Sequence, residues 1–216
     1  MLYLYALTEH PAVLPPSPVS LAAEPLDGID AVVGMIENEG IEPSEQEILK
    51  HARVVEELAA VNAALLPARF GLGFSDADAL QAAVAERIDG LHEALDRVRG
   101  CVELGVRVLS GKSSAVVPVG ASGREYMLGR LDERRSTERL ADELHGPLAA
   151  LARADTRSVG ATPELVLSAA YLVPHENVER FRALVDELGR ANAELTIACT
   201  GPWPPYSFAT AEVGGR

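Results

Sequence analysis

The order of hydrophobic periodicities after residue 100 leaves few folds open to this chain. Val102, Leu104, Val106 and Val108 alternate with polar or small residues, which predicts a half-buried strand. The elements predicted after it are a helix, two strands, a helix and a strand, at about 125–153, 156–160, 165–173, 174–189 and 194–200. This is the βαββαβ order of ferredoxin-like folds. The sequence therefore predicts an α+β protein whose C-terminal domain is ferredoxin-like.

The first half of the chain is predicted to hold two strands and two long helices. The strands span about 2–7 and 29–36, with a proline-marked loop between them. The first helix begins at Ser44, whose side chain can form a capping box with Glu47. The apolar stripes predicted to face the core are Ile48, Ala52, Val55, Leu58 and Asn62 in this helix, and Leu80, Val84, Ile88, Leu91, Leu95 and Val98 in a second helix that Ser75 caps and Gly100 ends.

Glycines and prolines mark the breaks between these elements. Gly100 is predicted to separate an N-terminal α/β domain, residues 1–99, from the ferredoxin-like domain, residues 100–200. A tail rich in proline and aromatic residues, 201–216, follows. Within the second domain, Gly146-Pro147 is expected to kink or split the long helix.

The composition and charge argue against several classes of partner. The 216 residues carry a formal net charge of -13, which repels nucleic acids and anionic membrane surfaces, because both are bound through Lys and Arg. No apolar run approaches the length of about 20 residues that spans a bilayer, and the apolar N-terminus lacks the basic residues of a secretory signal. Two cysteines fit a reducing cytoplasm. We therefore expect a cytoplasmic protein without a nucleic acid or membrane partner.

No residue pattern in the chain indicates catalysis, a cofactor or a metal. Gly111-Lys112-Ser113, in a predicted loop at 110–123, lacks the preceding glycine of a phosphate-binding loop. Gly120-Ala121-Ser122-Gly123 is not a nucleophile elbow, since it does not follow an apolar strand. The five histidines are scattered, and His51 is predicted to be a surface residue or a hydrogen-bonded core residue of its helix. We therefore predict no catalytic residue, cofactor or metal site.

Cys101 and Cys199 could lie near one another. They stand at the start of the first and the end of the last strand of the second domain, and these strands are antiparallel neighbours in a ferredoxin-like sheet. A reducing compartment nevertheless favours free thiols.

Four groups of residues, in order along nearly the whole chain, carry a family resemblance. They are Tyr3-Leu4-Tyr5-Ala6; His51-Ala52-Arg53-Val54-Val55-Glu56 followed by Leu66-Pro67-Ala68-Arg69-Phe70-Gly71; Gly100 to Val108 with Arg124 to Arg130; and Leu195 to Phe208. The most specific run is Thr200 to Phe208, with the sequence Thr-Gly-Pro-Trp-Pro-Pro-Tyr-Ser-Phe. Together they resemble the gas vesicle protein F/L family, which implies two α/β domains, the second ferredoxin-like.

The resemblance also implies a function. It implies an accessory protein of gas vesicle assembly and not an enzyme, without catalytic residues or a cofactor. The implied partners are the small hydrophobic gas vesicle shell protein and other gas vesicle accessory proteins, and the implied location is the cytoplasm, at the gas vesicle. The simplest mechanism is chaperone-like, in which the protein holds apolar surface of the shell subunit until that subunit polymerises. An exposed sheet edge could accept a strand of the shell protein.

Five residues are candidates for the partner-binding surface. They are Trp203, Tyr206, Phe208, Arg69 and Phe70. The prolines around Trp203 and Tyr206 favour an extended path that presents aromatic rings to a partner. The alternative is that the tail folds back and packs these rings against its own domain. Arg69 could contact a partner or form a structural ion pair with Glu57 or Glu103.

Two other classes of function are compatible with the sequence. Ferredoxin-like domains often bind small effectors, so a ligand-binding regulatory domain is the first alternative. A ligand-induced shift in melting temperature would favour it. The second is an enzyme whose site is assembled from distant residues, because a fold alone does not determine a function. A deep pocket lined by titratable groups would favour that interpretation.

Overall fold

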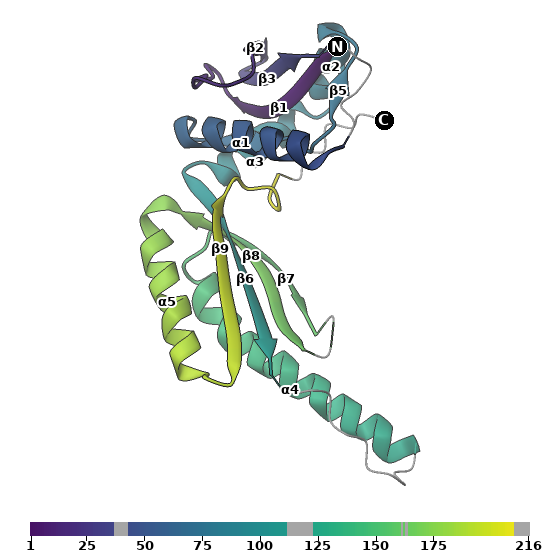
Figure 1. The fold of residues 1–216 in the computed structure, drawn as a ribbon, viewed down its shortest axis with the longest axis vertical. Coiled ribbons are helices and arrows are strands. Elements are labelled where there is room, and N and C mark those ends of the chain that lie inside the picture. Colours follow the sequence, from purple (N-terminus) through teal and green to yellow (C-terminus); the bar gives the residue numbers. More distant parts are fainter. Residues whose placement is uncertain (37–42, 112–122, 161, 163, 210–216) are drawn as a thin grey trace. The chain divides into compact units, whose positions relative to one another are not determined.

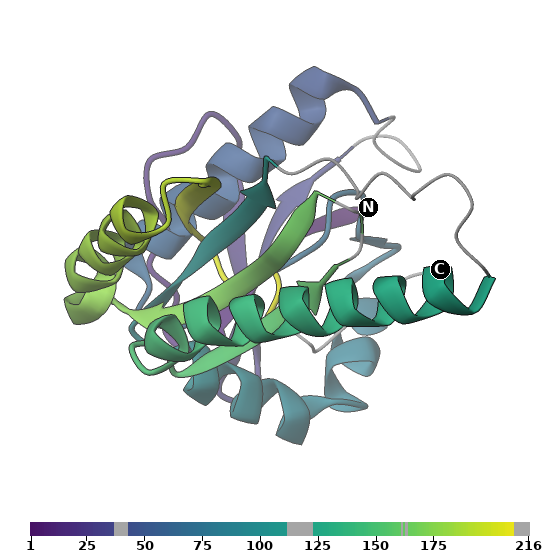
Figure 2. The ribbon, with the colours of Figure 1, turned by 90° about the horizontal axis from the view of Figure 1, so that it is seen from below.

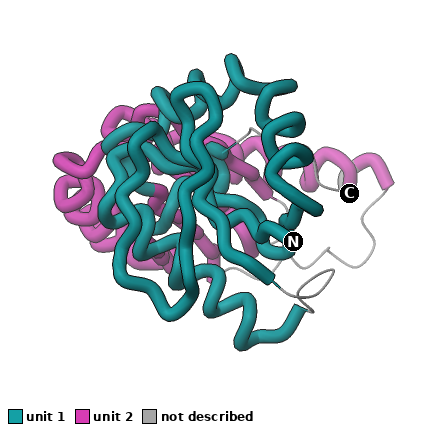
Figure 3. The backbone as a smooth tube through the Cα atoms, turned by 90° about the horizontal axis from the view of Figure 1, so that it is seen from above, with its two compact units in different colours: residues 1–102, 203–216 teal, residues 103–202 magenta. Residues whose placement is uncertain are grey.

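The computed structural model describes residues 1–36, 43–111, 123–160, 162 and 164–209. Within this part of the chain it contains five α-helices and two antiparallel β-sheets (Figure 1). The mixed α+β class predicted from the sequence is therefore confirmed. The chain forms two compact units (Figure 3). Unit 1 holds residues 1–102 and the described residues from 203 on, and unit 2 holds residues 103–202.

Unit 1 is built on an antiparallel sheet with the strand order β2-β3-β1-β4, and β5 also pairs with β1. The elements of this unit are β1 (Leu2–Glu9), β2 (Leu21–Leu26), β3 (Ile29–Met35), α1 (Glu45–Val61), β4 (Leu65–Pro67), β5 (Gly73–Phe74), α2 (Ala77–Ala85) and α3 (Ile88–Val98). Every residue of β1 from Tyr3 to Leu7 is at most 5% exposed, so both faces of this central strand are covered. Figure 2 shows α1 on one side of the sheet and the α2–α3 pair on the other.

Strand β2 corrects the sequence prediction, which places a loop before residue 29. It pairs with β3 along its whole length. A two-residue turn joins the two strands, and both of its residues have positive φ, 48° at Asp27 and 81° at Gly28. This is the backbone conformation of a type I′ hairpin, for which Asp-Gly is a preferred sequence. The dipeptide is thus the signal in the sequence that indicates β2.

Helix α1 begins where the sequence predicts, and Val55 and Leu58 of the predicted stripe are buried, but the buried face is rotated relative to the prediction. Ser44 is the N-cap, and its hydroxyl accepts a hydrogen bond from the backbone N–H of Glu47 (3.2 Å). The buried residues of the helix are His51, Val54, Val55 and Leu58, whereas Ile48 is 46% exposed. The helix packs on the tyrosines of β1, and the polar His51 faces the sheet because a tyrosine hydroxyl there can bond it.

The second predicted helix is in fact two helices, α2 and α3, separated at Glu86 and Arg87. Asp76, and not Ser75, caps α2. Its carboxylate accepts a hydrogen bond from the N–H of Ala79 (2.9 Å), while the Ser75 hydroxyl donates to Asp76 (2.9 Å). Asp is as good an N-cap as Ser, so the sequence alone does not separate the two. The predicted apolar stripe largely survives the break. Leu80, Val84, Leu91, Leu95 and Val98 are each at most 1% exposed, and Ile88, the first residue of α3, is half-buried.

Unit 2 is a four-stranded sheet with two helices, and its strand order is β7-β8-β6-β9. Its elements are β6 (Cys101–Ser110), α4 (Gly123–Ala149), β7 (Ala154–Val159), β8 (Leu165–Pro174), a 3-10 turn (His175–Asn177), α5 (Val178–Ala191) and β9 (Leu195–Trp203). The predicted order of strand, helix, strand, strand, helix and strand is confirmed. The predicted alternation in β6 is confirmed as well, since Leu104, Val106 and Val108 lie in the core of this unit.

The region around α4 corrects one expectation and leaves another outside the structure. The helix is not split at Gly146-Pro147, since it continues through them to Ala149, while the alternative of a kink there stays a prediction. Leu144 and Leu148, which flank the proline, are buried in the core, and this packing holds the last turn in place. Residues 112–122 lie outside the described residues, and with them most of the predicted loop at 110–123.

Both cysteines are free thiols, Cys101 buried and Cys199 half-buried. Burial raises the pKa of the Cys199 thiol, so this thiol is protonated at neutral pH. Among the helices of the described residues, none combines the length and the apolar character that crossing a membrane requires.

Candidate partner-binding surface

A buried histidine ties helix α1 to the segment 68–71. His51 is 5% exposed. Its Nε2 lies 3.0 Å from the carbonyl oxygen of Ala68, and its Nδ1 lies 2.9 Å from the hydroxyl of Tyr3. Because a carbonyl can only accept, Nε2 carries the proton and Nδ1 accepts from Tyr3. The Tyr3 oxygen in turn accepts a hydrogen bond from the backbone N–H of Gly71 (3.1 Å). This network of hydrogen bonds joins β1, α1 and the loop after β4.

Burial sets the protonation of this network. Desolvation lowers the pKa of His51, and the hydrogen bond to Ala68 opposes this only in part, so the ring is neutral at neutral pH. Burial also raises the pKa of Tyr3 to about 12. Both ring nitrogens of His51 are engaged, so neither can bind a metal or act as a base while the network is intact. Within the described ranges, no group of three or more His, Cys, Asp and Glu side chains could hold a metal ion.

Aromatic rings surround His51 on several sides. Tyr5 stacks on it with ring centroids 5.5 Å apart. Phe70 meets it edge-on at 5.8 Å and also meets Tyr3 edge-on at 6.4 Å. Such stacked and edge-on pairs are favourable at these distances. Phe70 is half-buried, so the cluster fixes its ring while part of the residue stays accessible to solvent.

Arg69, the neighbour of Phe70, is exposed. Glu57, one of its two predicted ion-pair partners, accepts a hydrogen bond from Arg53 Nε at 3.0 Å. The pairing of Arg69 with Glu57 or Glu103 stays a prediction. The structure therefore places Arg69 and Phe70 together where the hydrogen-bond network reaches the surface of unit 1.

The C-terminal segment combines buried anchors with exposed rings. After β9 the chain makes a compact turn, in which the N–H of Tyr206 donates to the carbonyl of Pro204 (2.8 Å) and the N–H of Phe208 to that of Pro205 (3.1 Å). Pro204, Pro205 and Phe208 are buried. Trp203 is 46% exposed and Tyr206 is 42% exposed. The two alternatives for the tail thus apply to different residues, because Phe208 packs inward while Trp203 and Tyr206 keep accessible surface.

The hydroxyl of Tyr206 lies in a less polar environment than its exposed surface suggests. Burial raises the pKa of Tyr206 to about 12, with smaller contributions from the charge of Glu56 and from Tyr3. Phe70 is a half-buried ring of the same unit and meets Tyr3 edge-on. We call Phe70, Trp203 and Tyr206 the aromatic surface of unit 1.

The link between Tyr3 and His51 does not follow from the sequence alone. His51 is a hydrogen-bonded core histidine, one of the two structural interpretations of its pattern. Its partners are distant in the chain, however, 48 residues away at Tyr3 and 17 at Ala68. The sequence does contain a signal for such a pair. It is a tyrosine in a buried strand and a histidine on an otherwise apolar helix face, because each needs a polar partner when it is buried.

Comparison with known proteins identifies the class of this chain. The model of the family described as gas vesicle synthesis protein GvpL/GvpF matches residues 1–210. Gas vesicle protein F2 of Halobacterium salinarum is 30% identical over 190 residues, which cover 87% of this chain and 79% of that protein. Gas vesicle protein L of a Streptomyces species is 33% identical over 181 residues, covering 74% and 67%. The crystal structure of gas vesicle protein GvpF from Microcystis aeruginosa shares the fold, with a TM-score of 0.78 over 97% of this chain and 98% of that one, at 22% identity.

These matches place the chain among the proteins of gas vesicle assembly. It belongs to the gas vesicle synthesis protein GvpL/GvpF family, as the resemblance of its sequence segments implies. Its role in gas vesicle assembly follows from that membership. Relatives of both the F and the L type match over most of the chain.

Proposed function

We propose that this protein acts in gas vesicle assembly by binding the small hydrophobic shell protein through its aromatic surface, and that it also binds other gas vesicle accessory proteins. The observation that carries this proposal is the position of the single tryptophan of the chain. Trp203 is 46% exposed, yet the two residues that follow it are buried prolines, and the buried Phe208 follows in the same short segment. A ring on a segment held this way has little conformational entropy left to lose on binding. Trp, Tyr and Arg are also the residues that contribute most to protein interfaces.

The proposed mechanism is chaperone-like and not catalytic. Phe70, Trp203 and Tyr206 would cover apolar surface of a shell subunit in the cytoplasm until the growing vesicle takes up that subunit. Arg69, exposed beside Phe70, would supply a charged rim that orients the partner. Phe208, also predicted to bind a partner, acts in this mechanism as the buried anchor of the segment.

We also propose a domain assignment within this function. Unit 2 would be a ferredoxin-like domain, which its element order and its strand order β7-β8-β6-β9 support. The proposed boundaries are 1–99, 100–200 and 201–216, and the start of the tail would serve the N-terminal domain. The surface that binds the shell protein would then be formed by the N-terminal domain together with the start of the tail.

The proposal is tested by a binding assay against purified shell protein. The variant Trp203→Ala/Tyr206→Ala removes two rings of the aromatic surface. Met35→Ala is the matched control, because Met35 is an apolar residue of the same unit that is 74% exposed. We expect the double variant to bind at least about tenfold more weakly, since Trp and Tyr are enriched among the few residues that contribute about 2 kcal/mol or more to an interface. Thermal melts of both variants show whether the fold is kept.

Equal binding by the wild type, the double variant and the control would rule out the aromatic surface as the contact. Light scattering tests the chaperone-like step separately. The wild type should delay aggregation of the shell protein, and the double variant should not. If neither chain changes the aggregation rate, the holding mechanism is wrong.

A further inference from the structure

A proline-rich segment between β1 and β2 has properties that the proposed function does not use. Residues 11–18 read Pro-Ala-Val-Leu-Pro-Pro-Ser-Pro, and we call them the proline segment. From residue 11 to residue 23 the sequence contains no charged side chain, although 24% of the chain is charged. Residues 12–17 form neither helix nor strand. An uncharged and irregular stretch of this length on an acidic protein calls for a physical explanation.

The prolines hold this segment extended. A proline ring fixes φ near -65°, which applies here to Pro15, Pro16 and Pro18. The residue before a proline is restricted to extended or polyproline II conformations, which applies to Leu14 and Ser17 as well as to Pro15. Every residue from 14 to 18 is therefore restricted by its own or its neighbour's ring. The Ser17 hydroxyl also accepts a hydrogen bond from the N–H of Val19 (3.4 Å), which closes the C-terminal end of the segment.

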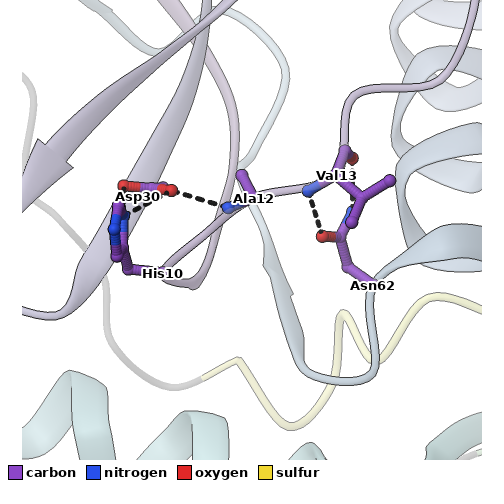
Figure 4. Close-up of polar contacts among 5 residues, drawn as sticks. All are labelled: His10, Ala12, Val13, Asp30 and Asn62. Carbon is purple, nitrogen blue, oxygen red and sulfur yellow. Dashed lines mark hydrogen bonds and ion pairs between the residues drawn. The ribbon is translucent and has the colours of Figure 1, made fainter.

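Two polar side chains anchor the other end of the segment (Figure 4). The carboxylate of Asp30, a residue that is 3% exposed, accepts a hydrogen bond from the N–H of Ala12 (2.7 Å) and lies 3.0 Å from His10 Nδ1. Asn62, at the end of α1, makes a pair of hydrogen bonds with the backbone of Val13. Its side-chain oxygen accepts from the N–H of Val13, and its side-chain nitrogen donates to the carbonyl of Val13, both at 2.9 Å.

The amide of Asn62 is fixed in this orientation. Its nitrogen also donates to the carbonyl of Leu58 (2.8 Å), so both amide hydrogens and the oxygen are used. A flipped amide would place its NH2 group against the N–H of Val13. Although its anchors are polar, the segment presents apolar side chains, since Val13 is 53% exposed and Leu14 is 39% exposed.

The backbone of the segment also offers hydrogen-bond acceptors. Among the described residues, no hydrogen bond reaches the carbonyl oxygens of Leu14, Pro15 or Pro16. A polyproline II strand has no internal hydrogen bonds and presents its carbonyls outward. Grooves lined by aromatic side chains recognise such strands. Their rings pack against prolines and apolar side chains, and Trp N–H or Tyr O–H groups donate to the carbonyls. A lipid surface offers no donors fixed in such a geometry.

We propose that the proline segment is a second docking site, which enters an aromatic-lined groove on another protein of gas vesicle assembly as a preformed polyproline II strand. This inference rests on the proposed function for its pool of partners, but it uses residues outside the aromatic surface. The anchors at Asp30 and Asn62 act as positioning residues. They reduce the entropy that the segment loses on binding, which is what makes a preformed strand bind more tightly than a flexible one.

The test measures pairwise binding of the full chain to each purified gas vesicle accessory protein and to the shell protein. Val13→Ser/Leu14→Ser removes the apolar side chains, and Pro15→Ala/Pro16→Ala releases the backbone. Trp203→Ala/Tyr206→Ala is the matched variant at the other surface, and thermal melts confirm folding. We expect one accessory protein to lose at least about tenfold in affinity for both proline-segment variants, and to bind the Trp203→Ala/Tyr206→Ala chain as well as wild type.

A photo-crosslinking side chain at Leu14 then locates the groove. The expected crosslinks fall on a partner segment flanked by Trp, Tyr or Phe, whereas the same probe at Met35 should give none there. The proposal is overturned if every interaction is insensitive to the proline-segment variants, or if the crosslinks fall outside aromatic residues. Binding to phosphatidylcholine vesicles that disappears in Val13→Ser/Leu14→Ser would instead identify a lipid-binding loop and would equally overturn it. Failure here with intact shell binding through Trp203 and Tyr206 leaves the proposed function standing.

Discussion

At the scale of single residues, the hydrogen bonds of His51 decide how the surface segment 68–71 is held. The imidazole donates to one carbonyl and accepts from one hydroxyl, an arrangement that only the neutral ring can make. A protonated ring would direct an N–H at the Tyr3 oxygen, which already accepts from Gly71, and the hydroxyl proton of Tyr3 would lose its acceptor. The position of Phe70 beside this network therefore depends on the protonation of a residue that is 5% exposed.

This protonation predicts a pH dependence of stability. The pKa of His51 is lowered in the folded protein from its ordinary value of 6.5, mainly by burial. The unfolded chain consequently binds more protons than the folded chain at pH values below about 6.5, until the pH reaches the folded pKa. We expect the free energy of unfolding to be independent of His51 above pH 7 and to fall as the pH decreases from about 6.5. Urea unfolding at pH 7.5, 6.5, 6.0 and 5.5 measures this slope.

The control for this measurement is His51→Phe, which keeps an aromatic ring but cannot titrate. The variant is expected to be less stable than the wild type at pH 7.5, because it leaves the Tyr3 hydroxyl and the Ala68 carbonyl without their partner. Its stability should fall less steeply between pH 6.5 and 5.5. The other four histidines are common to both proteins, so parallel slopes would show that His51 is not the titrating group.

At the scale of elements, the sequence predicts the helices and strands that have a clear hydrophobic periodicity. It does not predict β2, which a two-residue turn joins to β3. The capping box of Ser44 and Glu47 correctly marks the start of α1, and the alternation in β6 correctly predicts its buried face. The sequence does not give the rotation of α1, because Ile48 and His51 both fit a helical stripe, and the chemistry of the facing strand chooses between them. The sequence also does not indicate the break between α2 and α3, because the apolar stripe continues across it.

The pairing of β6 with β9 predicts a specific steric coupling. A Cβ atom added at Gly105 would lie 2.7 Å from Thr200 Oγ1, closer than carbon and oxygen atoms normally approach. Gly105→Ala should therefore lower the free energy of unfolding by up to about 1 kcal/mol, the low end of the cost of overpacking, because Thr200 is exposed and its side chain can rotate away in part. Thr200→Ala in the same chain removes the hydroxyl and should restore most of the loss. A double-mutant cycle by chemical denaturation measures this coupling, and additive effects of the two substitutions would contradict the predicted contact.

At the scale of the whole molecule, the chain crosses between its two units twice. Unit 2 is a continuous stretch, residues 103–202, whereas unit 1 needs both the first 102 residues and the segment that begins at Trp203. Closing unit 1 with its C-terminal segment makes the aromatic surface part of a folded unit. Trp203 and Tyr206 thereby belong to the same unit as Phe70, which lies far earlier in the sequence.

The C-terminal segment that closes unit 1 predicts different losses of stability for substitutions at two of its aromatic residues. Phe208 is 6% exposed, and Trp203 is 46% exposed. Phe208→Ala should cost about 3 kcal/mol of stability, in the range for truncating a buried phenylalanine, while Trp203→Ala should cost less than about 1 kcal/mol. Thermal and urea unfolding of the two variants measure the difference. Equal losses would mean that the two rings do not divide into an anchor and an exposed contact.

By itself, the sequence determined the local features of this protein and its family. Periodicity, capping residues and alternation are properties of neighbouring residues, so they predict the strands and helices of unit 2 in order, and the segments from Tyr3 to Phe208 carry the family resemblance. Only the tertiary structure decided which distant residues meet. His51 and its partner Ala68 are 17 positions apart, and Val13 and its anchor Asn62 are 49 positions apart. The burial of Phe208 likewise depends on the fold around it and not on its neighbours in the sequence. No local pattern records such contacts, because they form only where packing leaves a buried polar group in need of a partner or an apolar ring in need of a core.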